Sequence, residues 1–467
     1  MEPYYESPEV TLWHGDCLEV LRTLPDASVH AVVTDPPYGL GFMGKEWDKI
    51  KQEASRPPSA DRVDARFNNA FPRTGKGAAA TAFDGIGFGA WCLEWTAECL
   101  RVLKPGGHLL AFGGTRTWHR LACAIEDAGF EIRDSIAWMY GSGFPKSLDV
   151  SKAINKAAGA EREVVGDKLD RPGYHLHGHN GGEAFGHGLS SSTPETRLAS
   201  ALITAPATEA ARTWQGWGTA LKPAFEPIVV ARKPLTGTVA GNVLAHGTGA
   251  LNIDACRVES SETWIGSNEP STSANGYGPG DADGWQGRWT KRSQSHASGR
   301  WPANVILDED QAAALDEQSG ESQARIGKPQ GSAPGDGWGM TATGTEYDDL
   351  GGASRFFYVA KADASERPKV GGVAHPTVKP LTLMRWLVRL VTPPGGVVLE
   401  PFAGSGTTVE ACLLEGFRCV AIEKTEEYLP LIEARVHRRR DPVAAARLAA
   451  TGDDEASLFD LLNEEGA

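Results

Sequence analysis

The stretch that decides the fold is VVLEPFAGSGTT, residues 397–408. Its first three residues are apolar and lead to Glu400, which predicts a short strand buried on both faces. Residues 404–406, GSG, then predict a turn into a helix that begins near Thr408. A glycine turn lets a ligand approach the backbone, and the helix N-terminus offers free N–H groups to an anion. Because a tight turn without a ligand has the same pattern, other parts of the chain must support a binding site.

One such part is the next predicted strand, residues 419–423, which ends at Glu423. In Rossmann-like folds an acid about 20 residues beyond the glycine turn binds ribose hydroxyls. The position of Glu423 therefore favours a nucleoside-like ligand at the turn.

A proline-rich turn, TDPPYG at residues 34–39, follows another apolar strand, predicted at residues 30–34. Pro36 and Pro37 fix the backbone and lack N–H groups, so the Asp35 carboxylate and the Pro36 carbonyl remain as acceptors. These acceptors suit the two hydrogens of an amino group, and Tyr38 can stack on a planar ring. The alternative is a proline-rich turn with no ligand.

The two flanks of the chain alternate apolar strands with helices, which predicts an α/β fold with a mostly parallel sheet and helices on both faces. The middle of the chain is rich in glycine and weak in periodicity, which indicates long irregular insertions. Further strands are predicted at residues 10–13, 108–112, 135–140 and 227–231, and helices at residues 90–103, 118–128 and 381–391.

The chain has 467 residues and a net charge of −14, from 46 basic and 60 acidic residues. This charge argues against a protein that coats nucleic acid by charge alone, although it is compatible with a local basic groove. No apolar run reaches the length of a membrane-spanning helix, and the acidic first ten residues are unlike a secretory signal. The seven cysteines include no CxxC pair, which predicts free thiols in the cytoplasm.

Three motifs together resemble those of the DNA amino-methyltransferases: TDPPYG at residues 34–39, HPTVKP at residues 375–380 and EPFAGSGTT at residues 400–408. That family uses S-adenosylmethionine to methylate adenine N6 or cytosine N4. The proline motif comes before the glycine motif, with a long variable segment between them, as in the circularly permuted β class. The resemblance covers residues 10–140, 225–233 and 355–437, and it implies a circularly permuted, Rossmann-like methyltransferase sheet.

The resemblance also implies a division of the chain. The expected parts are a catalytic part with the proline motif (1–140), an insertion (141–224), a returning strand of the core (225–234), an insertion that recognises the DNA target (235–355), a cofactor-binding part (356–440) and an acidic flexible tail (441–467).

Individual roles follow from the same resemblance. The catalytic residues are expected to be Asp35, Pro36, Pro37 and Tyr38. The residues expected to bind S-adenosylmethionine are Asp16, Thr377, Lys379, Glu400, Phe402, Gly404, Ser405, Gly406, Thr407, Thr408 and Glu423. No metal is expected, because the histidines at 175, 177, 179 and 187 have no cysteine or acidic ligand pattern beside them.

The insertions are the expected source of sequence recognition, because their basic side chains alternate with tryptophans and can contact phosphates and base edges. A solvated loop is the alternative for this segment. Residues 45–48 are expected to form either a lid or an exposed loop. The residues expected to contact DNA are Lys45, Trp138, Arg257, Arg288, Lys291, Arg292 and Arg300. The basic run at residues 435–440 ends a predicted helix and is more typical of a solvated helix end.

The predicted function is methylation of adenine N6 in double-stranded DNA. Hydrogen bonds from the amino group to Asp35 and the Pro36 carbonyl would localise the nitrogen lone pair toward the methyl carbon. The base must first be flipped out of the duplex. An aspartate before the prolines favours adenine N6. The alternatives are cytosine N4, an RNA or protein-glutamine substrate, and a DNA-binding module without activity. We see no nuclease motif, so a restriction partner would be a separate protein, and the sequence indicates no oligomeric state.

Overall fold

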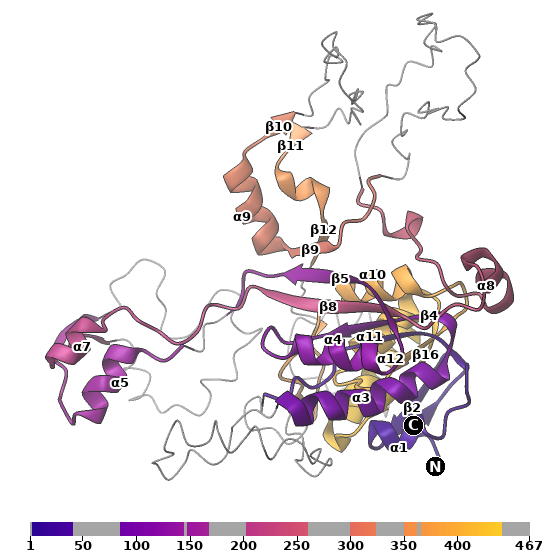
Figure 1. Cartoon of the computed structure of the whole chain (residues 1–467), viewed down its shortest axis with the longest axis horizontal. Coiled ribbons are helices and arrows are strands. Elements are labelled where there is room, and N and C mark those ends of the chain that lie inside the picture. Colours follow the sequence, from indigo (N-terminus) through magenta and orange to yellow (C-terminus); the bar gives the residue numbers. More distant parts are fainter. Residues whose placement is uncertain are drawn as a thin grey trace, which may run out of the picture.

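The computed structural model describes residues 2–40, 85–143, 147–167, 202–259, 299–323, 350–361 and 366–440. Within them, a ten-stranded sheet forms the centre of the molecule (Figure 1). In order across the sheet, its strands are β1 (Tyr5–Glu6), β2 (Val10–His14), β16 (Arg418–Glu423), β15 (Val397–Glu400), β3 (Val29–Thr34), β4 (Leu103–Phe112), β8 (Phe225–Arg232), β5 (Glu131–Met139), β9 (Val305–Asp308) and β12 (Tyr358–Ala360).

The sheet is mostly parallel, as the sequence predicts. Strands β2, β16, β15, β3 and β4 run in one direction. Strands β5, β9 and β12 share it, because β8 is antiparallel to both β4 and β5. The carboxyl ends of the parallel strands therefore lie at one edge, which we call the carboxyl edge. Since β8 runs the other way, its first residues lie there too, and Glu226 is paired with Trp138.

The two ends of the chain meet at the centre of the sheet. Strand β3 from the N-terminal part pairs with β15 from the C-terminal part, and Ala31 and Val32 lie opposite Val398 and Leu399. All four of these residues are fully buried. The two flanks of the sequence therefore form a single α/β sheet.

Helices cover both faces of the sheet, again as predicted (Figure 1). Side chains alternate between the faces of a strand, so Ala31 and Val33 join one apolar cluster and Val32 joins the other. The first cluster includes residues of α10 (Leu381–Val391), α11 (Thr407–Leu414) and α12 (Leu429–Arg440). The second includes residues of α1 (Cys17–Leu21), α3 (Gly85–Val102) and α4 (Trp118–Asp127).

The segment between β5 and β8 leaves the sheet and returns to it. Its described elements are α5 (Val150–Ala157), β6 (Val164–Asp167), β7 (Leu202–Thr204) and α7 (Glu209–Thr213). Helices α5 and α7 pack together away from the main sheet (Figure 1). Arg162 holds this unit together, since its guanidinium donates to Asn155 Oδ1 at 2.8 Å and to the Thr204 carbonyl at 2.9 Å.

The segment 235–355 is only partly an insertion. Its described elements are α8 (Val239–His246), a 3-10 helix (Asp254–Cys256), β9, α9 (Glu309–Ser319), β10 (Ser322–Gln323) and β11 (Leu350–Gly351). Strand β9 pairs in parallel with β5 inside the main sheet. The sequence did not indicate this strand, because an apolar run of only a few residues before a polar helix gives little periodicity to detect, and the role of the segment in target recognition stays a prediction.

The start of the basic run that ends α12 also differs from the prediction. Arg435 is 1% exposed, forms an ion pair with Glu410 of α11 and donates to the Ser405 carbonyl at 2.8 Å. Arg438 also pairs with Glu410, at 2.5 Å. Arg435 thus connects α12 to the glycine turn, and both arginines connect it to α11, so they are not a solvated helix end.

The hairpin of β13 (Lys369–Val370) and β14 (Val373–Ala374) precedes α10.

Candidate active site

The proline turn and the glycine turn lie next to each other at the carboxyl edge. Asp35 directly follows β3, and residues 401–406 directly follow β15, its parallel neighbour in the sheet. The two turns can be neighbours only if both ends of the chain fold into one sheet. The pairing of β3 with β15 shows that they do. An amino group at one turn and a ligand at the other would thus share the same side of the sheet.

Asp35 lies in a cluster of charged and polar groups from three segments of the chain. The Lys379 Nζ atom lies 2.7 Å from Asp35 Oδ2 and 3.0 Å from Glu226 Oε2. The Tyr38 hydroxyl lies 2.9 Å from Asp35 Oδ1 and 3.1 Å from Glu226 Oε2, and its single hydrogen can be donated to either. We call Asp35, Tyr38, Glu226 and Lys379 the acceptor cluster.

Burial and charge together set the protonation of this cluster. Burial alone would lower the pKa of Lys379, but the carboxylates of Asp35 and Glu226 outweigh it and raise that pKa above its ordinary value. Burial, and then the same two carboxylates, raise the pKa of Tyr38. At neutral pH the cluster therefore contains an ammonium group and a neutral phenol.

Aromatic rings form one wall around the ammonium group. Lys379 Nζ lies 4.8 Å from the ring centre of Phe112, 5.8 Å from that of Tyr38 and 6.0 Å from that of Trp138. Trp138 is 7% exposed and also packs against Tyr140, with ring centres 5.2 Å apart. Flat apolar surfaces beside hydrogen-bond acceptors suit a planar ring that bears an amino group.

The glycine turn has a backbone conformation and close packing that favour glycine. Gly404 and Gly406 have φ angles of +54° and +80°, in the left-handed region that favours glycine. A Cβ atom on Gly406 would lie 3.0 Å from the Ile432 Cα atom, and one on Gly404 would lie 3.3 Å from His375 Nε2. The turn is thus packed from behind by α12 and flanked by the HPTVKP segment.

Glu423 anchors the glycine turn. Its Oε2 atom accepts from the Gly404 backbone N–H at 2.7 Å, and its Oε1 atom accepts from Thr425 N–H at 2.7 Å. Burial raises the pKa of Glu423, and these N–H groups oppose that rise. Each carboxylate oxygen can accept a second hydrogen bond. Glu423 is therefore able to accept hydrogen bonds from ribose hydroxyls while it holds the turn.

Glu400, the last residue of β15, forms hydrogen bonds with residues of both turns. It is 1% exposed and accepts from the Thr34 hydroxyl, from the Thr408 hydroxyl at 2.6 Å and from Phe402 N–H at 3.1 Å. Burial raises the pKa of Glu400 to about 8, against the lowering effect of these donors. These contacts give Glu400 a structural role, and its direct contact with a cofactor stays a prediction.

The other expected cofactor residues have varied surroundings. Asp16 follows β2, accepts from Leu18 N–H at 3.0 Å and pairs with Lys424 at 2.9 Å. Phe402 packs against α3, with its ring centre 5.3 Å from that of Trp95. Ser405, Thr407 and Thr408 are buried behind the turn, and Thr377 lies in the segment beside it. Their contacts with a cofactor stay predictions.

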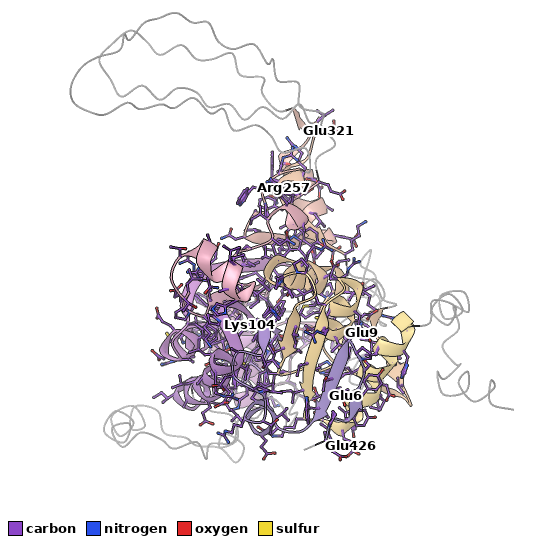
Figure 2. The ribbon with its side chains drawn as sticks, turned by 90° about the vertical axis from the view of Figure 1, so that its right-hand side faces the viewer. Glu6, Glu9, Lys104, Arg257, Glu321 and Glu426 are labelled. Carbon is purple, nitrogen blue, oxygen red and sulfur yellow. The ribbon has the colours of Figure 1, made fainter. Side chains whose placement is uncertain are left out.

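The residues expected to contact DNA are only partly described. Arg257 pairs with Asp254 at 2.9 Å, and its guanidinium lies 5.4 Å from the Trp301 ring centre. In Figure 2, Arg257 lies near the upper end of the molecule, below Glu321, and Glu426 lies at the lower end. Arg300 is 6% exposed, which does not favour a direct phosphate contact. Lys45, Arg288, Lys291 and Arg292, and the histidines at 175–187, lie outside the described residues.

Glu226 is a site residue that the sequence reasoning missed. It is the second residue of β8, ahead of a buried apolar run, and its side chain is 20% exposed. A rule that looks for polar residues after parallel strands does not find it, because β8 is antiparallel. An acid at the beginning of a buried strand that returns to the sheet is the signal that could have identified it.

The described part of the chain contains no group of three or more histidine, cysteine or acidic side chains that could hold a metal ion. All seven cysteines are free thiols, and six are buried. Among the described helices, none combines the length and apolar character needed to cross a membrane.

Comparisons with known proteins identify the family of this chain. The DNA methylase family of N6 and N4 methyltransferases matches residues 29–158 and 203–434. Type II methyltransferase M.HindIII of Haemophilus influenzae is 25% identical over 248 residues, which cover 52% of this chain and 64% of that protein. Type II methyltransferase M.BamHI of Bacillus amyloliquefaciens is 30% identical over 112 residues, which cover 24% of this chain and 19% of that protein. The chain thus spans less than two thirds of the length of either relative.

Among solved structures, PvuII DNA methyltransferase (cytosine-N4-specific) is similar with a TM-score of 0.40 and 14% identity, covering 93% of this chain and 88% of that one. Because the family match extends over more than half of the chain, this protein belongs to the N6/N4 family of DNA methylases.

Proposed function

We propose that this protein transfers a methyl group from S-adenosylmethionine to N6 of a flipped-out adenine, within a short specific sequence of double-stranded DNA. The observation that carries the proposal is the pairing of β3 with β15, which brings Asp35 and the glycine turn to one side of the sheet. The family membership supports a DNA amino group as the acceptor.

The residues of the glycine turn fit the cofactor. Gly404 and Gly406 allow the turn its left-handed backbone, and Glu423, which holds the turn, has capacity to accept from ribose hydroxyls. Asp16 follows β2, which is separated from β15 by β16 in the sheet. It is the expected partner of the amino group on the adenine ring of the cofactor. When bound, S-adenosylmethionine supplies a methyl group whose leaving group is a neutral thioether. The chain's own contribution is to hold donor and acceptor in line.

The proline turn would bind the acceptor base. An exocyclic amino group is a poor nucleophile because its lone pair is delocalised into the ring. Acceptance of its two hydrogens by Asp35 and the Pro36 carbonyl would localise that lone pair toward the methyl carbon. Tyr38 and the neighbouring aromatic wall would stack on the base and exclude water, and flipping the base out of the duplex costs a few kcal/mol.

The choice of adenine N6 over cytosine N4 depends on Asp35. An aspartate before the two prolines favours adenine, and cytosine N4 is the alternative within the same family. We also propose that Lys45, Trp138, Arg257, Arg288, Lys291 and Arg292 contribute to DNA binding.

Modification-aware sequencing of DNA from cells that express the protein, and contain no other DNA methyltransferase, tests the proposal directly. We expect N6-methyladenine at one short motif, and none with Asp35→Ala, although that variant still binds DNA in a mobility-shift assay. N4-methylcytosine at one motif would establish the alternative. Unmodified DNA from cells with folded wild-type protein would contradict both.

A further inference from the structure

Two members of the acceptor cluster, Lys379 and Glu226, have no part in the reaction described above. The sequence motif places Lys379 near the cofactor, but its ammonium group lies on the base-binding carboxylate, 2.7 Å from Asp35 Oδ2. Glu226 lies 3.0 Å from the same nitrogen. Both side chains are largely buried, with 12% and 20% of their surface exposed.

The ammonium group already makes the contacts that an amino group of the base would need. Its three hydrogens face Asp35 Oδ2, Glu226 Oε2 and the Tyr38 hydroxyl, the last at 3.4 Å. The aromatic rings that would stack on the base also surround it, with Phe112 closest at 4.8 Å. The Lys379 ammonium therefore competes with the amino group of the base for Asp35 Oδ2.

Each oxygen of Asp35 lies within hydrogen-bond distance of a polar group in this arrangement. Oδ1 lies 2.9 Å from the Tyr38 hydroxyl, and Oδ2 lies 2.7 Å from Lys379. A carboxylate oxygen can accept two hydrogen bonds, but a cation held on Oδ2 weakens its attraction for a neutral amino group. Efficient binding of the base thus requires the ammonium group to move away from Oδ2 while keeping a counter-charge, since an unpaired buried charge is costly.

Glu226 supplies that counter-charge from the opposite side. It comes from β8, whereas Asp35 follows β3, so the two carboxylates approach one nitrogen from separate elements. With both carboxylates ionised and Lys379 protonated, the three groups carry a net charge of −1. That charge complements the positive charge that passes from sulfonium to N6 in the proposed reaction. Without Glu226 the net charge would be zero, and the ammonium group would have Asp35 as its only carboxylate partner in the cluster.

We propose that Glu226 is a positioning residue: it receives the Lys379 ammonium group when the amino group of the base takes its place on Asp35. In this scheme Lys379 is a displaceable counter-cation that satisfies Asp35 in the absence of the base. The inference rests on the proposed function, and its test distinguishes the failure of one from the failure of the other.

The test is a double-mutant cycle on the single-turnover rate of DNA methylation, with Glu226→Gln, Lys379→Gln and the double variant. In Glu226→Gln, the ammonium group stays on Asp35, so we expect the rate to fall by about 10- to 100-fold with a smaller change in DNA affinity. Adding Lys379→Gln removes the competing cation, so the double variant should be about tenfold faster than Glu226→Gln alone. Glu226→Asp keeps the charge and should recover most of the rate.

Glu131→Gln is the matched control, because it also removes a carboxylate that pairs with a basic residue on the sheet. Glu131 lies 2.6 Å from Arg232, at the far end of β8, and its loss should leave the rate unchanged. Melting temperatures show whether each variant is folded. If Glu226→Gln does not fold, the rate of Lys379→Gln tests the inference. A rate of at least about a tenth of the wild-type rate would support Lys379 as a counter-cation, and a lower rate would contradict that role.

A wild-type rate in Glu226→Gln, or a double variant no faster than Glu226→Gln, would overturn the inference while leaving the proposed function intact. Absence of methylation by folded wild-type protein on DNA that contains its site would instead contradict the proposed function itself.

Discussion

Asp35 and Glu400 are carboxylates at the ends of two adjacent parallel strands, but their surroundings are opposite. Asp35 is 26% exposed on its side chain and pairs with a cation, Lys379. Glu400 is 1% exposed, and its described donors are two hydroxyls and a backbone N–H. Burial raises the pKa of Glu400 to about 8, and these neutral donors only partly oppose that rise.

This difference separates a group that meets a substrate from one that holds the site together. A carboxylate paired with a displaceable cation, beside aromatic rings, can exchange its partner for an amino group. An acidic side chain enclosed by neutral donors from both turns links those turns through its hydrogen bonds.

The largest effect is expected from Asp35→Asn, which keeps the shape of the side chain and removes its charge. Its amide group also presents donors where the amino group of the base needs an acceptor. We expect the methylation rate to fall by at least about 100-fold. The protein should stay folded, because Lys379 keeps Glu226 as its partner. Rates and melting temperatures measure both, and a fall of less than about threefold would remove Asp35 from the chemistry.

The next effect is a loss of stability in Glu400→Ala. That change leaves the hydroxyls of Thr34 and Thr408 and the N–H of Phe402 without their buried acceptor, so we expect the free energy of unfolding to fall by about 2–4 kcal/mol. Glu400→Gln is the matched control. It keeps the shape and one acceptor, and should cost less than about 1 kcal/mol at pH 7. Urea unfolding measures both, and equal losses in the two variants would contradict this role.

The smallest effect is a pH dependence of stability that Glu400→Gln removes. The pKa of Glu400 is about 8 when folded and near its ordinary value of 4.5 when unfolded, so the folded protein binds the extra proton between these values. Its contribution to stability is complete below about pH 4.5 and is lost as the pH rises through 8. Between pH 6 and pH 8 the wild type should lose about 2 kcal/mol relative to Glu400→Gln. If the stabilities of the two proteins changed in parallel with pH, Glu400 would be ionised in the folded protein at neutral pH, and its pKa would not be raised.

Much of this arrangement could be predicted from the sequence, because each turn directly follows an apolar strand. The glycine pattern at 404–406 and the prolines after Asp35 are local signals. Their order along the chain indicates that the two ends of the chain contribute strands to one sheet. The contacts of Lys379 and the burial of Arg435 could not be predicted, since they depend on side chains from elements far apart in the chain. Glu226 was missed because β8 runs against its neighbours.

The central claim is that a methyl donor at the glycine turn and an amino group at Asp35 meet in one site. A crystal structure with sinefungin, an analogue of S-adenosylmethionine with an amine in place of the methyl group, tests it most directly. The account predicts that this amine points at the proline turn, within about 7 Å of the Asp35 carboxylate, the span of one near-attack contact and one hydrogen bond. An analogue bound away from Gly404, or with its amine directed away from Asp35, would contradict the account.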